Sequence, residues 1–186
     1  MKRQKDDKGI DFPIIGICMG FEQIHYLAND DDKDTLSDLL IQAESRKIDF
    51  TVHNPTDYSL FRHFNEDLLE ALELEDLSLH SHRWVIKTDT YRQSTLLEDF
   101  FDILAVDEFE GDEFVVAVEG KHYPVTGVMF HPETQNRHGI FIDGEPDGSI
   151  KGKINNEKTD AINYHFSEHV HARGMMTIES HKFADP

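Results

Sequence analysis

The fold is decided by one stretch, Ile14-Ile15-Gly16-Ile17-Cys18-Met19-Gly20-Phe21-Glu22. A short apolar run ends there, the chain's single cysteine follows, and the pattern then becomes helical. This order is typical of a nucleophile elbow, in which a buried strand turns sharply into a helix and presents one reactive side chain at the bend. We expect a side chain in place of Gly16 or Gly20 to collide with its surroundings in so tight a turn.

Cys18 is therefore the candidate nucleophile. It precedes the free N–H groups of the expected helix, whose partial positive charge favours a thiolate over a thiol. The alternative is an ordinary strand-to-helix turn that carries an inert, buried cysteine. A single cysteine also excludes an internal disulfide.

Composition narrows the class of protein. The 186 residues, 38% hydrophobic and 30% charged, are typical of one globular domain. A formal net charge of −19 argues against nucleic acid and against anionic membrane surfaces as partners. No apolar run approaches the length that spans a bilayer, and the charged residues 1–8 do not resemble a secretory signal peptide.

The remaining pattern mixes strands and helices, which indicates an α/β fold class. We expect strands at residues 13–17, 39–41, 48–52, 77–79, 84–87, 103–107, 113–119 and 124–130, and helices at 19–28, 65–74, 95–101 and 157–173. Between them we expect a loop crossing at 80–83, an acidic turn at 108–112 and a long loop at 134–156. Gly174 is the expected end of the last helix.

A cysteine nucleophile needs a base to take its proton and an acceptor to orient that base. The segment His131-Pro132-Glu133 ends the expected strand 124–130. Residues i and i+2 of an extended backbone face the same way, so Glu133 can reach the imidazole of His131. Pro132 stiffens the step between them. The alternative is a strand-terminating turn with two exposed polar residues; together with Cys18, the segment predicts a Cys-His-Glu triad.

These motifs carry a resemblance. Gly16-x-Cys18-x-Gly20, followed by Gly127-Val128-x-Phe130-His131-Pro132-Glu133, resembles the class I glutamine amidotransferase superfamily and its Cys-His-Glu triad. The amidotransferases usually carry glutamine four residues after the cysteine. Glu22 stands there in this chain, which is similar to the gamma-glutamyl hydrolase branch.

Three further segments resemble that branch. His82-Arg83-Trp84 matches its His-Lys-Trp segment, and residues 119–125 match its Glu-Gly-x-x-Tyr-Pro-Val run. Residues 158–173 are similar to its C-terminal helix. The likeness covers most of residues 13–173.

The resemblance implies a flavodoxin-like sheet with flanking helices and hydrolysis of γ-glutamyl amide bonds, in folate or antifolate poly-γ-glutamates, without a cofactor. Cys18 would form a thioester, His131 would move protons, and Glu133 would orient His131. The backbone N–H of Met19 would stabilise the oxyanion. Glu22 and His82 would bind substrate or support the site, and Glu22 could contact His82. Two alternatives stay open: a glutaminase domain of an amidotransferase, and a catalytically inactive, truncated relative.

Family members begin with several strands and helices before the elbow. The resemblance therefore predicts a chain truncated at its N-terminus, with a polar lead-in at 1–12, a catalytic domain at 13–174 and a tail at 175–186. The absent part would supply the second oxyanion donor. A lysosomal or extracellular location is implied by the family, although residues 1–8 carry no signal pattern. No nucleic acid or membrane partner is expected, and a homodimer stays open.

Two clusters could suggest a metal. His165 and His169 are spaced i, i+4 on the last expected helix, but no acidic or cysteine ligand completes a site. The acidic run at 30–34 lacks the glycine and terminal glutamate of a calcium loop. We therefore expect a solvated helix face, a solvated loop and no metal.

Overall fold

The computed structural model of the chain describes residues 12–135 and 157–183. A five-stranded sheet has the strand order β1-β7-β6-β5-β3, and β2 and β4 form a separate antiparallel pair. The strands are β1 (Ile14–Ile17), β2 (Ser37–Arg46), β3 (Asp49–Phe50), β4 (Ser78–Val85), β5 (Phe101–Phe109), β6 (Asp112–Gly120) and β7 (Val125–Val128). The α-helices are α2 (Met19–Ala28), α3 (Glu66–Leu74), α4 (Thr88–Gln93), α5 (Thr95–Phe100) and α6 (Glu157–Phe183). Short 3₁₀ helices are η1 (Lys33–Thr35), η2 (Pro55–Asp57) and η3 (Pro132–Gln135).

β1 and β7 carry the two halves of the predicted site. They run parallel, with Ile14 opposite Val125 and Ile17 opposite Val128. The other neighbours in this sheet, β7–β6, β6–β5 and β5–β3, are antiparallel. Because β1 and β7 run in the same direction, the residues that follow them emerge at the same end of the sheet.

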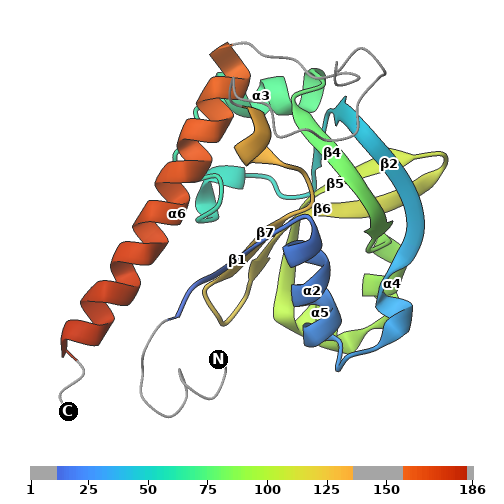
Figure 1. Ribbon diagram of the computed structural model, residues 1–186, viewed down its shortest axis with the longest axis horizontal. Coiled ribbons are helices and arrows are strands. Elements are labelled where there is room, and N and C mark those ends of the chain that lie inside the picture. Colours follow the sequence, from blue (N-terminus) through green and yellow to red (C-terminus); the bar gives the residue numbers. More distant parts are fainter. Residues whose placement is uncertain (1–11, 136–156, 184–186) are drawn as a thin grey trace.

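Helices cover both faces of β7. Successive residues of a strand point to opposite faces, so Thr126 and Gly127 report on the two sides. Thr126 bonds to His169 of α6, whereas a Cβ on Gly127 would come within 3 Å of side chains of α2, at 2.8 Å from Phe21 and 2.9 Å from Ile24. α6 therefore lies on one face and α2 on the other (Figure 1). The predicted α/β class, a central sheet with flanking helices, is confirmed.

The core centres on β6. Residues 115–118 of that strand, Val-Val-Ala-Val, are fully buried. A strand covered on both faces needs apolar side chains at every position rather than at alternate ones, which explains this continuous run. Among the residues that the structure describes, no helix has the length and apolarity needed to cross a membrane.

The expected loop crossing at 80–83 is wrong, because β4 runs unbroken from Ser78 to Val85. Polar residues there indicated a loop, but His80 and His82 are buried and bond to each other. Three of their four ring nitrogens are thereby paired inside the protein.

Other elements also differ from the sequence-based expectation: β2 is longer than the expected strand at 39–41, α4 was not expected, and the β5–β6 turn and the end of the last helix lie elsewhere. The turn between β5 and β6 is shorter than predicted, because Glu110 and Gly111 both take positive φ, 55° and 87°, as a tight two-residue hairpin turn requires. The last helix does not end at Gly174 and continues to Phe183. One glycine inside a long helix costs only about 1 kcal/mol. Residues 136–156 of the expected long loop, and the lead-in up to residue 11, lie outside the described residues.

Candidate active site

Cys18 lies at the bend between β1 and α2. Its backbone takes φ 50° and ψ −110°, a left-handed conformation that costs a non-glycine residue about 1–3 kcal/mol. The N–H of Cys18 donates to the carbonyl of Val128 (3.0 Å), and its own carbonyl accepts from the N–H of Glu22 (3.0 Å). Strand and helix thus hold the strained residue from both sides, as in a nucleophile elbow.

The two glycines around Cys18 differ. A Cβ on Gly16 would lie 2.7 Å from the carbonyl oxygen of Gly20 and 2.9 Å from the backbone nitrogen of Phe21. The close approach of β1 to the first turn of α2 therefore requires a glycine at 16. A Cβ on Gly20 would meet nothing within 4 Å, so the expected collision at Gly20 is wrong.

His131 follows β7 and faces both Cys18 and Glu133. Its Nδ1 lies 2.8 Å from Oε1 of Glu133, and the imidazole also hydrogen-bonds the side chain of Cys18. Because Nδ1 faces the carboxylate, Nε2 is the ring nitrogen left for the sulfur. The N–H of His131 donates to the carbonyl of Leu79 (2.8 Å), which ties this segment to β4. The structure thus brings together the three residues of the predicted triad.

The charges of its partners dominate the electrostatics of His131. Burial lowers the pKa of the imidazole, but hydrogen bonds to Cys18 and Glu133, and the negative charges of both, outweigh burial and raise this pKa to about 10. The side chain of His131 is 18% exposed and that of Glu133 is 42% exposed, so solvent partly screens the carboxylate. The arrangement favours an imidazolium at His131, between the sulfur of Cys18 and the carboxylate of Glu133.

The thiol of Cys18 has a second acceptor. Its sulfur lies 3.6 Å from the carbonyl oxygen of Ser81 on β4. A protonated sulfur can donate to this carbonyl, whereas a thiolate can only accept, from His131. Met19, the predicted oxyanion donor, is the first residue of α2, so its N–H has no acceptor within the helix.

Glu22 and His82 are both buried, at 9% and 6% exposure. Burial raises the pKa of Glu22. The suggested contact between them is absent: Nε2 of His82 bonds Nδ1 of His80 (3.0 Å), and Nδ1 of His82 has no hydrogen-bond partner among the described residues. Burial, and then the charges of His131 and Arg46, lower the pKa of His82 to about 4.

Sequence reasoning missed the residues behind His82. Ser78, His80 and His82 alternate along β4, and all three are buried. The signal was available as polar residues at i, i+2 and i+4, which share one face of a strand. It was hidden because we expected a loop at 80–83.

The expected solvated face around His169 is also wrong. His169 is 3% exposed; its Nδ1 donates to the carbonyl of Ser59 (3.0 Å), and its Nε2 accepts from the hydroxyl of Thr126 (3.0 Å). Both ring nitrogens are therefore occupied within the protein. No group of three or more metal-ligating side chains occurs in the part of the chain that the structure describes.

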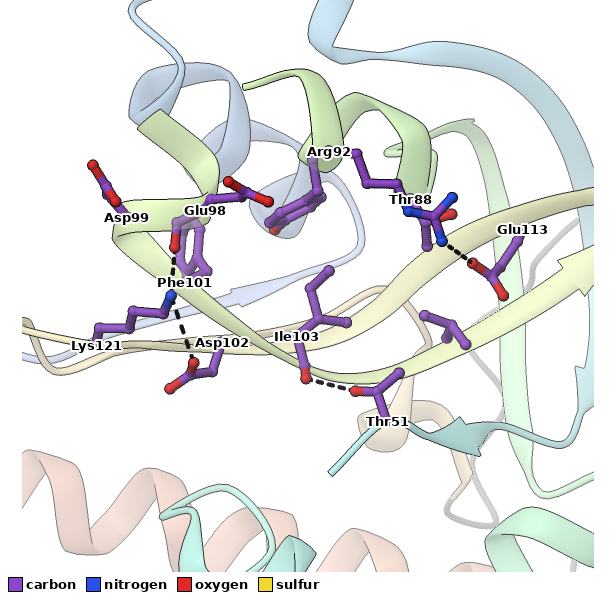
Figure 2. Close-up of a pocket in the computed structure, with 12 residues that line it drawn as sticks. Thr51, Thr88, Arg92, Glu98, Asp99, Phe101, Asp102, Ile103, Glu113 and Lys121 are labelled. Atoms are coloured by element: carbon purple, nitrogen blue, oxygen red, sulfur yellow. Dashed lines mark hydrogen bonds and ion pairs between the residues drawn. The ribbon is translucent and has the colours of Figure 1, made fainter. Parts of the chain in front are cut away.

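A pocket of about 640 Å³ lies between α4, α5, β5 and β6, away from these residues. Figure 2 shows two ion pairs among the residues that line it: Lys121 lies 3.8 Å from Asp102, and Arg92 lies 3.9 Å from Glu113. None of the residues that line this pocket belongs to the Cys18 centre.

One known protein family matches most of this chain. Residues 3–140 match the family model of glutamine amidotransferase class-I. The chain belongs to the class I glutamine amidotransferase family.

Curated relatives narrow the likeness further. Gamma-glutamyl hydrolase of Mus musculus is 32% identical over 127 residues, which cover 68% of this chain and 39% of that protein. Gamma-glutamyl hydrolase of Homo sapiens is 32% identical over 144 residues (76% and 43%), and gamma-glutamyl hydrolase 1 of Arabidopsis thaliana is 30% identical over 132 residues (70% and 37%). The chain thus spans about two fifths of the length of these relatives.

Proposed function

We propose that this chain carries the thiol centre of a γ-glutamyl hydrolase, with Cys18 as nucleophile, His131 as acid and base, and Glu133 as the group that orients His131. The observation that carries the proposal is the single cysteine at a strained strand-to-helix bend, hydrogen-bonded to a histidine that itself bonds a carboxylate. The relatives named gamma-glutamyl hydrolase support the choice of bond.

In the first half of the reaction, the sulfur of Cys18 attacks the γ-amide carbonyl carbon, and the carbonyl electrons move to oxygen. The N–H of Met19, at the N-terminus of α2, donates to that oxygen; such a donor is worth about 10²–10³ in rate. The imidazolium of His131 protonates the leaving nitrogen as the C–N bond breaks. The products are a free amine and a thioester on Cys18.

In the second half, neutral His131 takes a proton from water while the water oxygen attacks the thioester carbonyl. The C–S bond breaks, the γ-carboxylic acid leaves, and the sulfur regains its ion pair with the imidazolium. Glu133 stabilises the cation in both halves. Proton transfer by a positioned residue contributes about 10²–10⁴ in rate.

For the substrate, we propose a folate or antifolate poly-γ-glutamate, with Glu22 and His82 beside the reacting bond. The net charge of −19 repels a polyanion in solution. Added salt screens that repulsion, so we expect KM for a polyglutamate to fall as ionic strength rises.

The test is incubation with methotrexate-diglutamate, with the released glutamate measured. We expect cleavage by the native chain and none by Cys18→Ala. Cleavage that survives in Cys18→Ala would refute Cys18 as nucleophile. Ammonia release from free glutamine, without cleavage of the diglutamate, would instead support a glutaminase.

A further inference from the structure

Ser78, His80 and His82 form a buried polar column on β4, and the donors and acceptors of its hydrogen bonds can be assigned. The hydroxyl of Ser78 donates to the carbonyl of Arg46 (2.7 Å), which can only accept. Oγ of Ser78 must then accept in its other contact, with Nε2 of His80 at 3.2 Å. His80 therefore carries its hydrogen on Nε2, and a neutral His80 presents Nδ1 as an acceptor.

The next contact follows from this one. Nδ1 of His80 lies 3.0 Å from Nε2 of His82, so Nε2 of His82 must be the donor. Burial lowers the pKa of both rings, of His80 well below its usual value and of His82 to about 4, which keeps both neutral. A neutral His82 with hydrogen on Nε2 has a bare lone pair on Nδ1.

Nδ1 of His82 is buried and has no hydrogen-bond partner in the part of the chain that the structure describes. An unpaired buried acceptor destabilises the folded chain, and a donor that reaches it relieves this cost. The atom belongs to a ring close enough to His131 for the charge of His131 to lower its pKa. On either side of His80, the carbonyls of Leu79 and Ser81 hold His131 and Cys18, so β4 carries the column directly behind the thiol centre.

We propose that Ser78 and His80 are positioning residues that fix His82 in the Nε2–H tautomer, so that Nδ1 of His82 accepts an N–H group of the substrate. The inference rests on the proposed function, which supplies a substrate with amide N–H groups. A bare nitrogen lone pair repels a carboxylate, so His82 selects the N–H group and not the α-carboxylates of a γ-glutamyl chain.

The experiment uses the full chain with ¹⁵N-labelled histidine and a pair of variants at one position. Glutamine at 80 keeps both an acceptor for His82 and a donor for Ser78, whereas leucine keeps neither. We expect long-range ¹H–¹⁵N spectra to show His82 as the Nε2–H tautomer alone in the native chain and in His80→Gln. In His80→Leu we expect a mixture of the neutral Nε2–H and Nδ1–H tautomers. Ser78→Ala, which frees His80 to turn, gives the same mixture, and Ser78→Thr does not.

Kinetics separate a positioning role from a structural one. For methotrexate-diglutamate we expect His80→Leu to raise KM about twofold with the two tautomers about equally populated, because only one of them can accept the substrate N–H group. The rate of Cys18 alkylation by methyl iodide, which carries no N–H donor, stays unchanged. Nδ1 of His82 protonated in the native chain, or a single tautomer retained in both His80→Leu and Ser78→Ala, would overturn the inference. Absence of hydrolysis in the native chain would count against the proposed function, while the spectra still decide the tautomer.

Discussion

His131 follows strand β7 and His169 bonds Thr126 of that strand, yet the protein favours a charged ring at His131 and a neutral ring at His169. The pKa of His131 is raised to about 10, and that of His169 is lowered to about 4. Burial lowers the pKa of both rings, so burial does not distinguish them. The difference lies in their partners: a carboxylate and a sulfur for His131, and a hydroxyl and a carbonyl for His169.

The surroundings of each ring match its charge state. His169 joins α6 to β7, and on the same helix Arg173 lies 3.5 Å from Glu119 of β6. The neighbouring charge of Arg173 further disfavours a cation at His169. The surroundings of His131, after β7, thus favour a protonated ring, whereas those of His169, beside Thr126 of β7, favour a neutral one.

The largest expected effect comes from removing the charged histidine. We expect His131→Gln to slow both γ-glutamyl hydrolysis and alkylation of Cys18, with hydrolysis falling about 10²–10⁴-fold because proton transfer is lost. Iodoacetamide reports on Cys18 alone, since the chain has no other cysteine. His169→Gln is the matched control and should leave the alkylation rate at its native value; equal losses in both variants would erase the contrast between the two rings.

The neutral ring of His169 should make the unfolding free energy fall at acidic pH. A pKa lowered from 6.5 to about 4 means that neutral His169 stabilises the fold above pH 6.5, and that this contribution is lost as pH falls towards 4. Over that window it amounts to about 3 kcal/mol. Glutamine can donate to Ser59 and accept from Thr126 without titrating, so we expect His169→Gln to flatten the fall in unfolding free energy, measured by urea titration at each pH.

His171 supplies the control for this measurement, because it is exposed on the same helix. His171→Gln should leave the pH dependence as it is in the native chain. The pKa values of His25 and His82 are also lowered to about 4, so these two rings keep part of the acid sensitivity in every variant. A His169→Gln curve that runs parallel to the native one would contradict the assignment of His169 as a neutral ring.

The sequence predicted the charged half of this comparison far better than the neutral half. Cys18, His131 and Glu133 could be found because a tight turn and an i, i+2 pair constrain their neighbours in the chain. His169 could not, since its partners Thr126 and Ser59 are 43 and 110 residues away. Helical spacing shows which residues share a face, but not whether that face is buried.

The same limit explains the errors in the fold. Hydropathy predicted the buried run of β6 and the helix after Cys18, because apolar side chains determine both. It failed for β4, where two buried histidines at alternate positions hydrogen-bond each other. It also failed at Gly174, where a typical helix-ending residue lies inside α6.

A third prediction concerns the backbone on which the charged site rests. We expect Gly16→Ala to destabilise the protein by about 2 kcal/mol, because the new Cβ would overlap backbone atoms of Gly20 and Phe21 that cannot move independently. Gly20→Ala, with nothing within 4 Å of its Cβ, should be neutral or stabilising by up to about 1 kcal/mol. Thermal unfolding of the two variants measures the difference, and equal melting temperatures would show that the bend tolerates a side chain.

The smallest effect is expected for a substitution at Glu133 that removes the charge of the side chain and keeps its shape. Glu133→Gln can still accept from Nδ1 of His131 but no longer stabilises the imidazolium, so the pKa of His131 should fall. Since the leaving amine needs the proton of that imidazolium, the alkaline limb of the pH–rate profile should move to lower pH, with about a tenfold loss of rate above about pH 10. The effect is modest because Glu133 is 42% exposed and solvent screens its charge. Glu119→Gln, which changes a carboxylate near His169 instead, should leave this limb in place. If Glu133→Gln also leaves the limb in place, the charge on Cys18 alone sets the state of His131, and the carboxylate only orients the ring.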